Sequence, residues 1–332
     1  MPPTEVISGL FQLKVPIPNN PLGYVLPYLI PGDDGYTLVD CGWNTDEAFE
    51  ALESQLRELS VSFDDIKRLL ITHVHPDHYG LAGRIKEICN PEIIIHQRER
   101  DFIRSRYRAP EQLLERMSVW LAEQGVPEDE VQELRSSSMP VRGLVTPVEP
   151  DTVLWGGEKL DFGLYQFEVF WTPGHSPGHM CFYERTQRII LTGDHVLPNI
   201  TPNVSMHPQQ LGNPLGDYLA SLQRLEVLEV DDVLLAHEHL FKDLKGRLVS
   251  IVEHHEERLG EMLGIIGDGQ ATAYDVASKV VWTIGTFDTF SLWTRRAAIS
   301  ETVAHLEYAV YDGRLRQLRE DGKVKYEKAA AE

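Results

Sequence analysis

The spacing of hydrophobic and polar residues changes several times along the chain. The first 42 residues contain three short stretches rich in β-branched and aromatic residues, separated by Pro, Gly and Asn: VISGLFQLKV, YVLPYLI and YTLVDCG. This pattern predicts short strands joined by turns. Residues 44–59 then place Leu52, Leu56 and Leu59 at helical spacing, with Asn44 as the expected N-cap. The strands RLLIT and EIIIH follow with a helix between them, so strand and helix alternate as in α/β proteins.

A long charged stretch over residues 98–143 interrupts this alternation, and its apolar residues keep helical spacing. Because structureless loops of this length are uncommon in compact domains, we predict an inserted pair of helices here. Strand patterns return at TVLWGG, KLDF, YQFEVFWT, MCFYE and RIILTGD, and later at DDVLLAHEHL. They predict a second set of strands.

The residues after Leu263 have the pattern of a separate small unit. A GDGQ turn is followed by two helical patterns and by a predicted hairpin with Asp321 and Gly322 at its turn. Helices followed by a β-hairpin are typical of a winged-helix-like α+β domain. We therefore expect a larger unit over residues 1–264, which contains the insertion, and a winged-helix-like unit over residues 265–332.

Three imidazoles and a carboxylate lie within six residues, directly after the predicted strand RLLIT: His73, His75, Asp77 and His78. Zinc and similar metals bind nitrogen and oxygen donors of this kind. His73 and His75 are two apart on extended backbone and point to the same side, while a turn at Pro76 redirects Asp77 and His78. The motif therefore predicts a metal site at the carboxyl end of a buried strand.

Three later segments also follow predicted strands and can converge on the same sheet edge: TPGHSPGH, TGD and AHE. Together with HxHxDH, this ordered set resembles the metallo-β-lactamase fold superfamily of metal-dependent hydrolases over roughly residues 5–260. The resemblance implies an αββα sandwich in an α/β chain, with a dinuclear metal site at one edge. The larger unit would then be the catalytic domain.

The resemblance also implies a role for each candidate residue. It places two divalent ions, Zn²⁺ first, with Fe or Mn as alternatives, on seven ligands. The first ion would be held by His73, His75 and His175, the second by Asp77, His78 and His237, with Asp194 bridging the two. Each ion would lower the pKa of bound water towards about 7 and so supply a hydroxide that attacks a carbonyl. Asp77 would be the catalytic residue that orients this nucleophile and relays its proton.

Several neighbouring residues are interpreted with the motifs. Asp40 ends an early strand, and we expect it beside the metal ligands. His239 competes with His237 as a ligand, and the small residue before His237 favours the latter. Asn203 and His207 lie on the loop after the TGD motif, which makes them candidates for substrate contact.

Other histidines are expected to have structural roles. We interpret His195 as a packing residue, and His179 either as a support for the ligands or as a hydrogen-bonded structural residue. His254, His255 and Arg258 lie on a predicted helix, where a solvated face is the preferred interpretation over a cleft-lining one.

The charge distribution narrows the choice of partners. The net charge is −20, from 31 Lys+Arg and 51 Asp+Glu, and the excess of acid lies in residues 1–264. Such a field repels phosphate backbones, so nucleic acid is not the expected partner and a small acyl substrate is. The sequence contains no apolar run of about 20 residues and no signal-peptide pattern, so we expect no membrane contact and a cytoplasmic location.

These features favour hydrolysis of a small thioester or lactone, because Asp194 and the cytosolic context resemble the hydroxyacylglutathione hydrolase branch. The C-terminal unit departs from that branch. The alternatives are an endoribonuclease or phosphodiesterase using the same metals, and β-lactam hydrolysis as a promiscuous activity. A nuclease would need a basic groove in the tail, formed by Arg314, Arg316, Arg319, Lys323 and Lys325. A nonenzymatic DNA-binding regulator is disfavoured, and we prefer an interaction role for the C-terminal unit, such as formation of a homodimer.

Overall fold

The computed structural model describes residues 2–108, 110–137 and 139–329, and its centre is a pair of stacked β-sheets. The first sheet has the strands, in spatial order, β1 (Thr4–Ile7), β2 (Leu10–Gln12), β5 (Tyr28–Gly32), β6 (Gly35–Val39), β7 (Ile66–Leu70), β8 (Glu92–His96) and β9 (Thr152–Leu154). The second has β10 (Lys159–Asp161), β11 (Gln166–Trp171), β12 (Met180–Glu184), β13 (Ile189–Gly193) and β14 (Asp232–Leu235). Strands β6 to β9 run parallel, as do β13 and β14, so their carboxyl ends share one edge.

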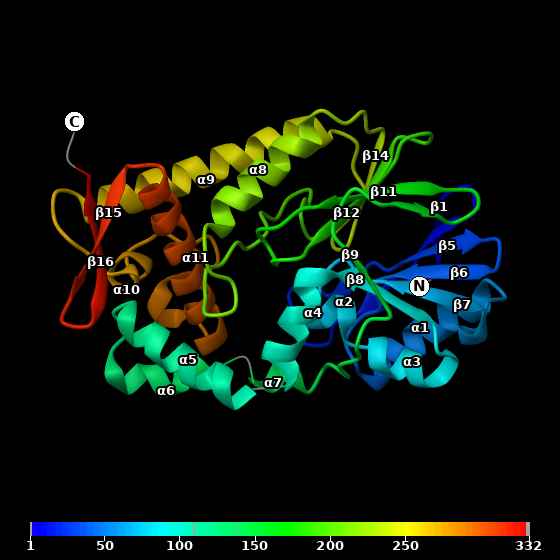
Figure 1. Ribbon diagram of the computed structural model, residues 1–332, viewed down its shortest axis with the longest axis horizontal. Helices are drawn as coiled ribbons and strands as arrows, with labels where there is room; N and C mark the ends of the chain where they lie inside the picture. The colour runs from blue at the N-terminus through cyan, green and yellow to red at the C-terminus, as the bar shows by residue number, and fades with distance from the viewer. Residues whose placement is uncertain (1, 109, 138, 330–332) are drawn as a thin grey trace.

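The two sheets pack face to face through one apolar layer, and helices cover their outer faces. This layer joins Tyr28, Val39 and Leu70 of the first sheet to Phe167 and Phe182 of the second. The covering helices are α1 (Asp46–Glu58) and α3 (Ala82–Cys89) on the first sheet, and α8 (Pro214–Glu226) and α9 (Leu244–Ile266) on the second (Figure 1). The predicted αββα sandwich is thus confirmed.

Helix α1 begins one residue later than its sequence pattern predicts. Thr45 is the N-cap, and its side chain accepts a hydrogen bond from the backbone N–H of Ala48. Asn44 instead donates its side-chain amide to the Thr146 hydroxyl at 2.6 Å, which ties the start of α1 to the segment after the insertion. The predicted strand EIIIH coincides with β8.

The segment predicted as an inserted helical pair contains more helix than a pair. Its longest elements are α5 (Pro110–Glu123) and α6 (Glu128–Ser136), which pack together. They are flanked by α4 (Gln97–Ile103), the π-helical segment η2 (Arg104–Arg108) and the short helix α7 (Met139–Arg142). The charged residues of this segment concealed where one helix ends and the next begins.

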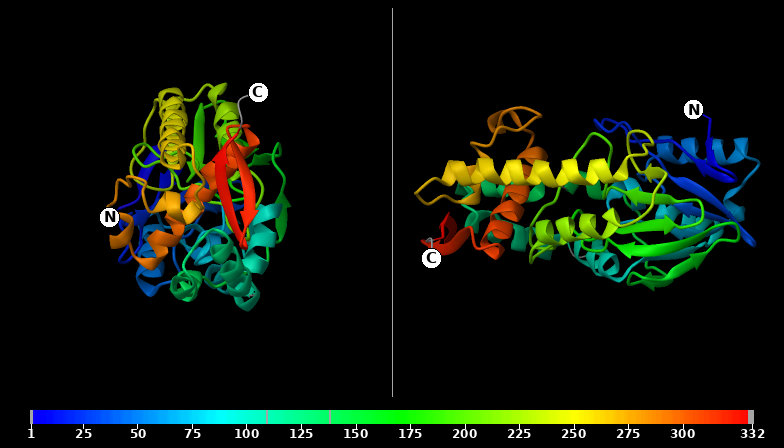
Figure 2. Two further views of the ribbon diagram at one scale, coloured as in Figure 1. Left: turned by 90° about the vertical axis from the view of Figure 1, so that its left-hand side faces the viewer. Right: turned by 90° about the horizontal axis from the view of Figure 1, so that it is seen from above.

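The C-terminal residues form α10 (Ala273–Ala277), the 3₁₀ turn η3 (Phe287–Thr289), α11 (Leu292–Tyr311) and a hairpin of β15 (Leu315–Glu320) and β16 (Lys323–Lys328). Asp321 and Gly322 make the predicted turn, with φ of 49° and 75°. Helix α9 runs unbroken across the boundary predicted at residue 264 and connects the sandwich to these elements (Figure 2). The division into two units stays a prediction.

The insertion and the C-terminal elements share one apolar core. Trp120 and Leu121 of α5 and Leu134 of α6 belong to the same cluster of buried residues as Val303 of α11 and Tyr326 of β16. The inserted helices are thereby held against the C-terminal helices, at a distance from most of the sandwich (Figure 1). Among the described residues, no helix is both long and apolar enough to cross a membrane.

The remaining elements are short, and all but the turn before β7 lie near the sheet edge that carries the histidine motif. They are the hairpin strands β3 (Val15–Pro16) and β4 (Tyr24–Val25), the 3₁₀ turn η1 (Phe63–Asp65) and the single-turn helix α2 (Pro76–Tyr79). Helix α2 begins at Pro76, the turn residue of the histidine motif, with His75 as its N-cap.

Candidate metal centre

The seven residues predicted as metal ligands lie together at the carboxyl edge of the two sheets. Four follow β7, and the others follow β11, β13 and β14. Their donor atoms fall into three overlapping groups, each within 4.8 Å: His73, His75 and His175; His73, His78 and Asp194; Asp77, His78 and His237. The strand ends therefore bring together residues that are up to 164 positions apart in the sequence.

Asp194 lies between the two outer groups. Its Oδ2 is 3.5 Å from Nε2 of His175 and 3.4 Å from Nε2 of His78, and its Oδ1 is 3.3 Å from Nε2 of His237. Nε2 of His237 is also 3.4 Å from a carboxylate oxygen of Asp77. Asp194 thus occupies the position that a bridging ligand needs.

Hydrogen bonds to backbone carbonyls fix two of the imidazoles with their Nε2 atoms facing inward, whereas His75 turns its Nδ1 towards Nε2 of His73 and of His175, at 2.9 Å and 3.0 Å. Nδ1 of His237 donates to the backbone carbonyl of Tyr24, and Nδ1 of His175 donates to that of Asn203, each at 2.8 Å. A carbonyl oxygen only accepts, so Nδ1 of each ring carries a proton, and Nε2 is the atom that a metal would bind.

The centre also contains buried polar atoms that lack a hydrogen-bond partner within the described part of the chain. Three such atoms face the centre: Nε2 of His78, Nε2 of His237 and Oδ1 of Asp194. An unsatisfied buried polar atom costs about 1–3 kcal/mol, and a divalent cation would satisfy all three. The residues present therefore fit the metal ions that this fold implies.

Charge is balanced so that the carboxylates stay ionised. Burial opposes ionisation of Asp194, but His237 and His78 outweigh it and hold the pKa of Asp194 well below its usual value. Burial, together with the neighbouring imidazoles, lowers the pKa of His73 and of His75 well below the usual range. Burial disfavours the charged form of His78 and His237, but Asp194 outweighs it and raises the pKa of His237 to about 10 and that of His78 well above its usual value. Metals bind neutral imidazole and ionised carboxylate, so metal binding would release a proton from each of these two rings.

Asp40 holds a candidate ligand by hydrogen bonds, as expected from its position after β6. Its carboxylate accepts the Nδ1 proton of His78 at 2.8 Å and the backbone N–H of Thr72 at 2.9 Å. Its backbone is left-handed, with φ of 60°, a conformation that Asp tolerates better than most residues. Asp40 thereby fixes both a candidate ligand and the start of the loop that carries it.

Glu99, on α4, has a supporting role that the sequence analysis missed. Its buried carboxylate accepts hydrogen bonds from the backbone N–H of Val74 at 2.8 Å, and from the Ser176 hydroxyl and the Gly178 N–H at 2.6 Å each. A Cβ at Gly178 would lie 2.8 Å from Glu99, so glycine permits this approach. Glu99 joins the HxHxDH loop to the TPGHSPGH loop. The available signal was its position just after a buried strand on the same sheet edge.

The other predicted histidines fall in different environments. His239 is exposed, whereas His237 is fully buried at the centre. His179 receives the backbone N–H of Asp194 at 3.2 Å, which fits a supporting role, and His195 packs its ring 4.8 Å from that of Tyr218.

The prediction of a solvated face on the helix now identified as α9 was wrong for two of its three residues. His255 and Arg258 are 3% and 9% exposed, whereas His254 is half-buried. His255 packs against α11 through a contact with His305, and Arg258 pairs with Glu261. A partner helix from the C-terminal region covers this face, and its contact could not be read from local periodicity.

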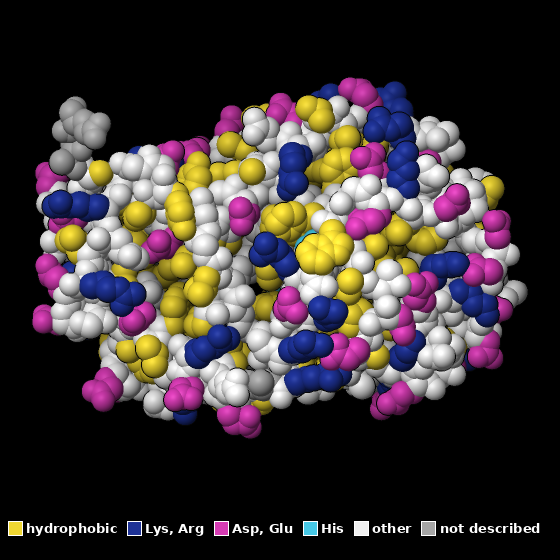
Figure 3. All heavy atoms as spheres, in the orientation of Figure 1, with side chains coloured by type: hydrophobic (Ala, Val, Ile, Leu, Met, Phe, Trp, Pro, Cys, Tyr) yellow, Lys and Arg dark blue, Asp and Glu magenta, His cyan; other side chains and the backbone are white. Residues whose placement is uncertain are grey.

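A pocket of about 460 Å³ opens onto the centre, between the sandwich, the insertion and α11. Asn203 and His207 line it, together with an apolar wall that includes Leu113, Leu114 and Met117 of α5. In the middle of the face shown in Figure 3, basic and hydrophobic side chains lie next to one another. The pocket thus combines an apolar wall with polar groups beside the candidate ligands.

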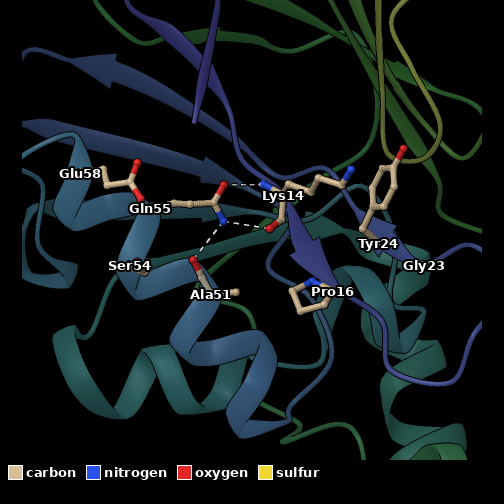
Figure 4. Close-up of a pocket in the computed structure, with 8 residues that line it drawn as sticks. All are labelled: Lys14, Pro16, Gly23, Tyr24, Ala51, Ser54, Gln55 and Glu58. Carbon is tan, nitrogen blue, oxygen red and sulfur yellow. Dashed lines mark hydrogen bonds between the residues drawn. The ribbon is translucent and has the colours of Figure 1, made fainter. Parts of the chain in front are cut away.

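A second hollow, of about 380 Å³, lies between α1 and the β3–β4 hairpin (Figure 4). There the Lys14 ammonium lies 3.5 Å from the ring centre of Tyr24, and the Gln55 amide donates to the Lys14 carbonyl at 2.8 Å. None of the eight residues that line this hollow is a candidate ligand.

Comparisons with known proteins agree with this geometry. A family model described as the Metallo-beta-lactamase superfamily matches residues 20–237. A metallo-beta-lactamase family protein from Thermus thermophilus is 33% identical, with a TM-score of 0.82 over 98% of this chain and 100% of that one. A beta-lactamase domain protein from Burkholderia ambifaria is 25% identical, with a TM-score of 0.81 over 99% and 97%.

Two curated relatives have names that describe an enzymatic activity. The protein named "Probable metallo-hydrolase YqjP" of Bacillus subtilis is 27% identical over 309 residues, which cover 90% of this chain and 92% of that protein. The acyl-coenzyme A thioesterase MBLAC2 of Gallus gallus is 28% identical over 176 residues, 51% of this chain and 56% of that protein. The chain belongs to the metallo-beta-lactamase superfamily and is a metal-dependent hydrolase.

Proposed function

We propose that the protein hydrolyses a small thioester or lactone with two divalent ions, Zn²⁺ first, at the centre between the strand ends. The observation that carries this proposal is the pocket of about 460 Å³, which is closed by the insertion and α11 and opens onto Asp77 and Asp194. A pocket of this volume suits a small ligand. The thioesterase named among the relatives supports the same class of reaction.

The ions would be held by the seven ligands named above. When bound, they supply a polarised carbonyl oxygen and a nucleophile at neutral pH. Asp77 lines the pocket while its Oδ2 lies 3.4 Å from Nε2 of His237. Its carboxylate is therefore placed to orient the attacking group and to carry a proton to the leaving sulfur or oxygen.

The apolar wall of the pocket would hold the acyl group. Leu113, Leu114 and Met117 lie along one side of α5, and Trp43 lines the pocket from the sandwich. Each methylene that such a wall removes from water contributes about 0.8 kcal/mol to binding. An acyl chain would be oriented in this way with its carbonyl towards Asp77 and Asp194.

The nuclease alternative is weakened because basic residues of the C-terminal tail form ion pairs with acidic residues. Arg314 pairs with Glu256 and Asp312, Arg319 with Glu123 at 3.0 Å, and Lys325 with Glu320 at 2.7 Å. Arg316 also pairs with Glu327. These cations are already neutralised by acids, so they do not form the basic groove that RNA binding needs.

The test is a panel of thioesters, lactones, a β-lactam and RNA, assayed on one metal-loaded preparation. We expect hydrolysis of at least one thioester or lactone, with Asp77→Asn as the control for contaminating enzymes. Asp77-dependent cleavage of RNA without small-ester activity would replace the proposal by the nuclease alternative. Preferred hydrolysis of the β-lactam would identify that ring as the substrate instead.

A further inference from the structure

Arginines gather around the active-site pocket, although the chain as a whole is acidic. Four line it: Arg106 of η2, Arg135 of α6, Arg142 of α7 and Arg296 of α11. Among the described lining residues, the acids are Asp77 and Asp194, which belong to the metal centre. The net charge of the chain is −20, so this concentration of positive charge is a local feature of the pocket.

The structure gives three of these arginines no carboxylate partner within its described residues. Arg142 donates to the Tyr107 carbonyl at 2.9 Å, and Arg135 donates to the Ser118 hydroxyl at 3.2 Å. The guanidinium of Arg106 lies 5.3 Å from the ring centre of Phe102. Their positive charges are therefore not neutralised by ion pairs, unlike those of the tail arginines.

Arg296 brings a fourth charge to the same place from the C-terminal helices. Its guanidinium lies 5.1 Å from the ring centre of Trp293 and donates to the Arg135 carbonyl at 3.4 Å. Burial, followed by the charge of Arg106, lowers the pKa of Arg296 to about 10, so it stays protonated at neutral pH. Like charges that line one pocket repel one another, and an anion in the pocket would relieve the repulsion.

The arginines also lie close to the chemistry. Arg106 and the candidate ligand His75 line the same pocket, as do Arg142 and the apolar residue Met139 beside it. A molecule that fills the pocket would meet the metal centre, the apolar wall of α5 and at least one guanidinium. Guanidinium groups match the planar, two-oxygen edge of phosphate and carboxylate.

We propose that Arg106, Arg135, Arg142 and Arg296 bind an anionic group on the leaving-group half of the substrate. The acyl group would lie on the wall of Leu113, Leu114 and Met117. This inference rests on the proposed function, and it defines the substrate as an apolar acyl ester of an anionic carrier. The anionic group is a phosphate or a carboxylate.

The first experiment compares thioesters of one acyl group on different carriers. The substrates are hexanoyl thioesters of coenzyme A, 4′-phosphopantetheine, pantetheine and glutathione, which differ in phosphate and carboxylate content. We expect kcat/KM for an anionic carrier to exceed that for neutral pantetheine by about ten- to hundredfold, the effect of one charge-assisted hydrogen bond. A preference for the phosphate carriers or for glutathione identifies the anion, and either supports the inference.

The variants are Arg106→Gln and Arg296→Gln, with Arg106→Lys as the conservative change. The ratio of kcat/KM between anionic and neutral thioesters should fall about tenfold or more in the glutamine variants, mainly through KM. Arg106→Lys should retain part of the ratio, because it keeps the charge but loses the planar contact. The matched control is Arg185→Gln, which removes an exposed arginine paired with Glu168 and not part of the pocket.

A binding measurement separates this inference from the proposed function. S-ethyl-coenzyme A has no scissile carbonyl, and its Kd can be measured by calorimetry on the metal-loaded protein and compared with that of S-ethyl-pantetheine. We expect tighter binding of the coenzyme A thioether, weakened about tenfold in Arg106→Gln and Arg296→Gln and by added salt.

The outcomes differ for the two ideas. Arginine-dependent binding without hydrolysis of any ester would overturn the proposed function and leave the anion site standing. Ester hydrolysis with equal kcat/KM on neutral and anionic carriers, unaffected by the arginine variants, would overturn the anion site and leave the function standing. Arginine-dependent cleavage of RNA in place of the thioesters would overturn both.

Discussion

At the scale of single residues, the buried carboxylate of Glu99 shows how one side chain fixes two loops. Burial raises its pKa, while the Ser176 hydroxyl and the Val74 and Gly178 N–H groups oppose that rise. All three donors point at the carboxylate, and they belong to the two loops that carry five of the seven candidate ligands. We therefore assign Glu99 a positioning role.

Glu99→Gln should weaken metal binding and lower stability. The amide presents N–H groups where two acceptor oxygens are needed, so at least one donor is left unsatisfied, at a cost of about 1–3 kcal/mol. Competition with a chelator measures the metal Kd, and thermal unfolding measures stability. Glu115→Gln, an exposed glutamate on α5, is the matched control. An unchanged metal Kd would show that Glu99 has no positioning role.

Two neighbouring histidines give a second prediction at this scale. His237→Ala should reduce the metal content, because it removes a fully buried Nε2 that faces Asp77 and Asp194. His239→Ala should leave the metal content unchanged, because His239 is exposed. Elemental analysis of both variants measures the difference. The reverse result would assign the ligand to His239.

The sequence predicted the candidate ligands better than the groups that hold them. Their spacing after predicted strands brought His73, His175 and Asp194 to one edge, because parallel strand ends meet there. The backbone carbonyl of Tyr24 and the carboxylate of Glu99 were not predicted. A carbonyl has no residue-type signature, and Glu99 lies in a stretch whose many charges conceal the buried one.

At the scale of secondary-structure elements, α9 and α11 meet through two buried histidines. Nδ1 of His305 donates to the Glu301 carbonyl at 2.8 Å, so its Nε2 accepts the Nδ1 proton of His255 at 3.1 Å. Nε2 of His255 is buried and has no hydrogen-bond partner in the described part of the chain. Both rings are therefore neutral in the folded protein.

This contact should make stability depend on pH. Burial lowers the pKa of His305 to about 4 and that of His255 to about 2, and His254, Arg258 and the neighbouring Tyr218 supply no negative charge to offset it. The unfolded chain takes up these protons below about pH 6.5, so stability is lost as pH falls from 6.5 towards 4. For His305 alone the loss is on the order of 3 kcal/mol.

The measurement is the unfolding free energy between pH 7 and 4. His305→Gln, which does not titrate in this range, should show a smaller fall than the wild type, while His239→Gln, at an exposed histidine outside this contact, should resemble the wild type. Equal falls in all three proteins would remove this pair from the acid response. Protonation of the metal ligands affects each protein alike and cancels in the comparison.

The elements of the sandwich were more predictable than those of the insertion. The strand EIIIH is preceded by the turn signal Asn90-Pro91, and helix α1 shows a regular apolar stripe. Residues 98–143 bury part of their surface against α11 and β16, from a distant part of the chain. The positions of their apolar residues therefore depend on packing partners from a distant part of the chain, which the local sequence does not reveal.

At the scale of the whole molecule, metal ions should contribute to stability as well as to catalysis. The centre brings Asp77 and Asp194 together with His78 and His237, whose Nε2 atoms lack hydrogen-bond partners among the described residues. Ions that bind only the folded chain stabilise it by mass action, about 2.7 kcal/mol at one hundred times Kd. The centre thereby links folding to metal supply.

We therefore predict about two equivalents of divalent metal per chain, since seven ligands exceed the four that one tetrahedral ion uses. Treatment with a chelator should lower the melting temperature by several degrees, and reloading should restore it. Elemental analysis and thermal unfolding on one preparation test both statements. A metal-free protein with unchanged melting and activity would contradict the metal centre.

The pocket is bounded by the sandwich, the insertion and α11, and this arrangement has a consequence for how substrate preference can change among relatives. Its metal centre stands on the ends of sandwich strands, whereas the four arginines stand on η2, α6, α7 and α11, which share few backbone contacts with those strands. In the proposed site, the groups that react and the groups that select the carrier thus lie on different segments of the chain. An exchange of the insertion and α11 together, as one co-packed block, should transfer carrier preference between relatives while the reaction itself is retained.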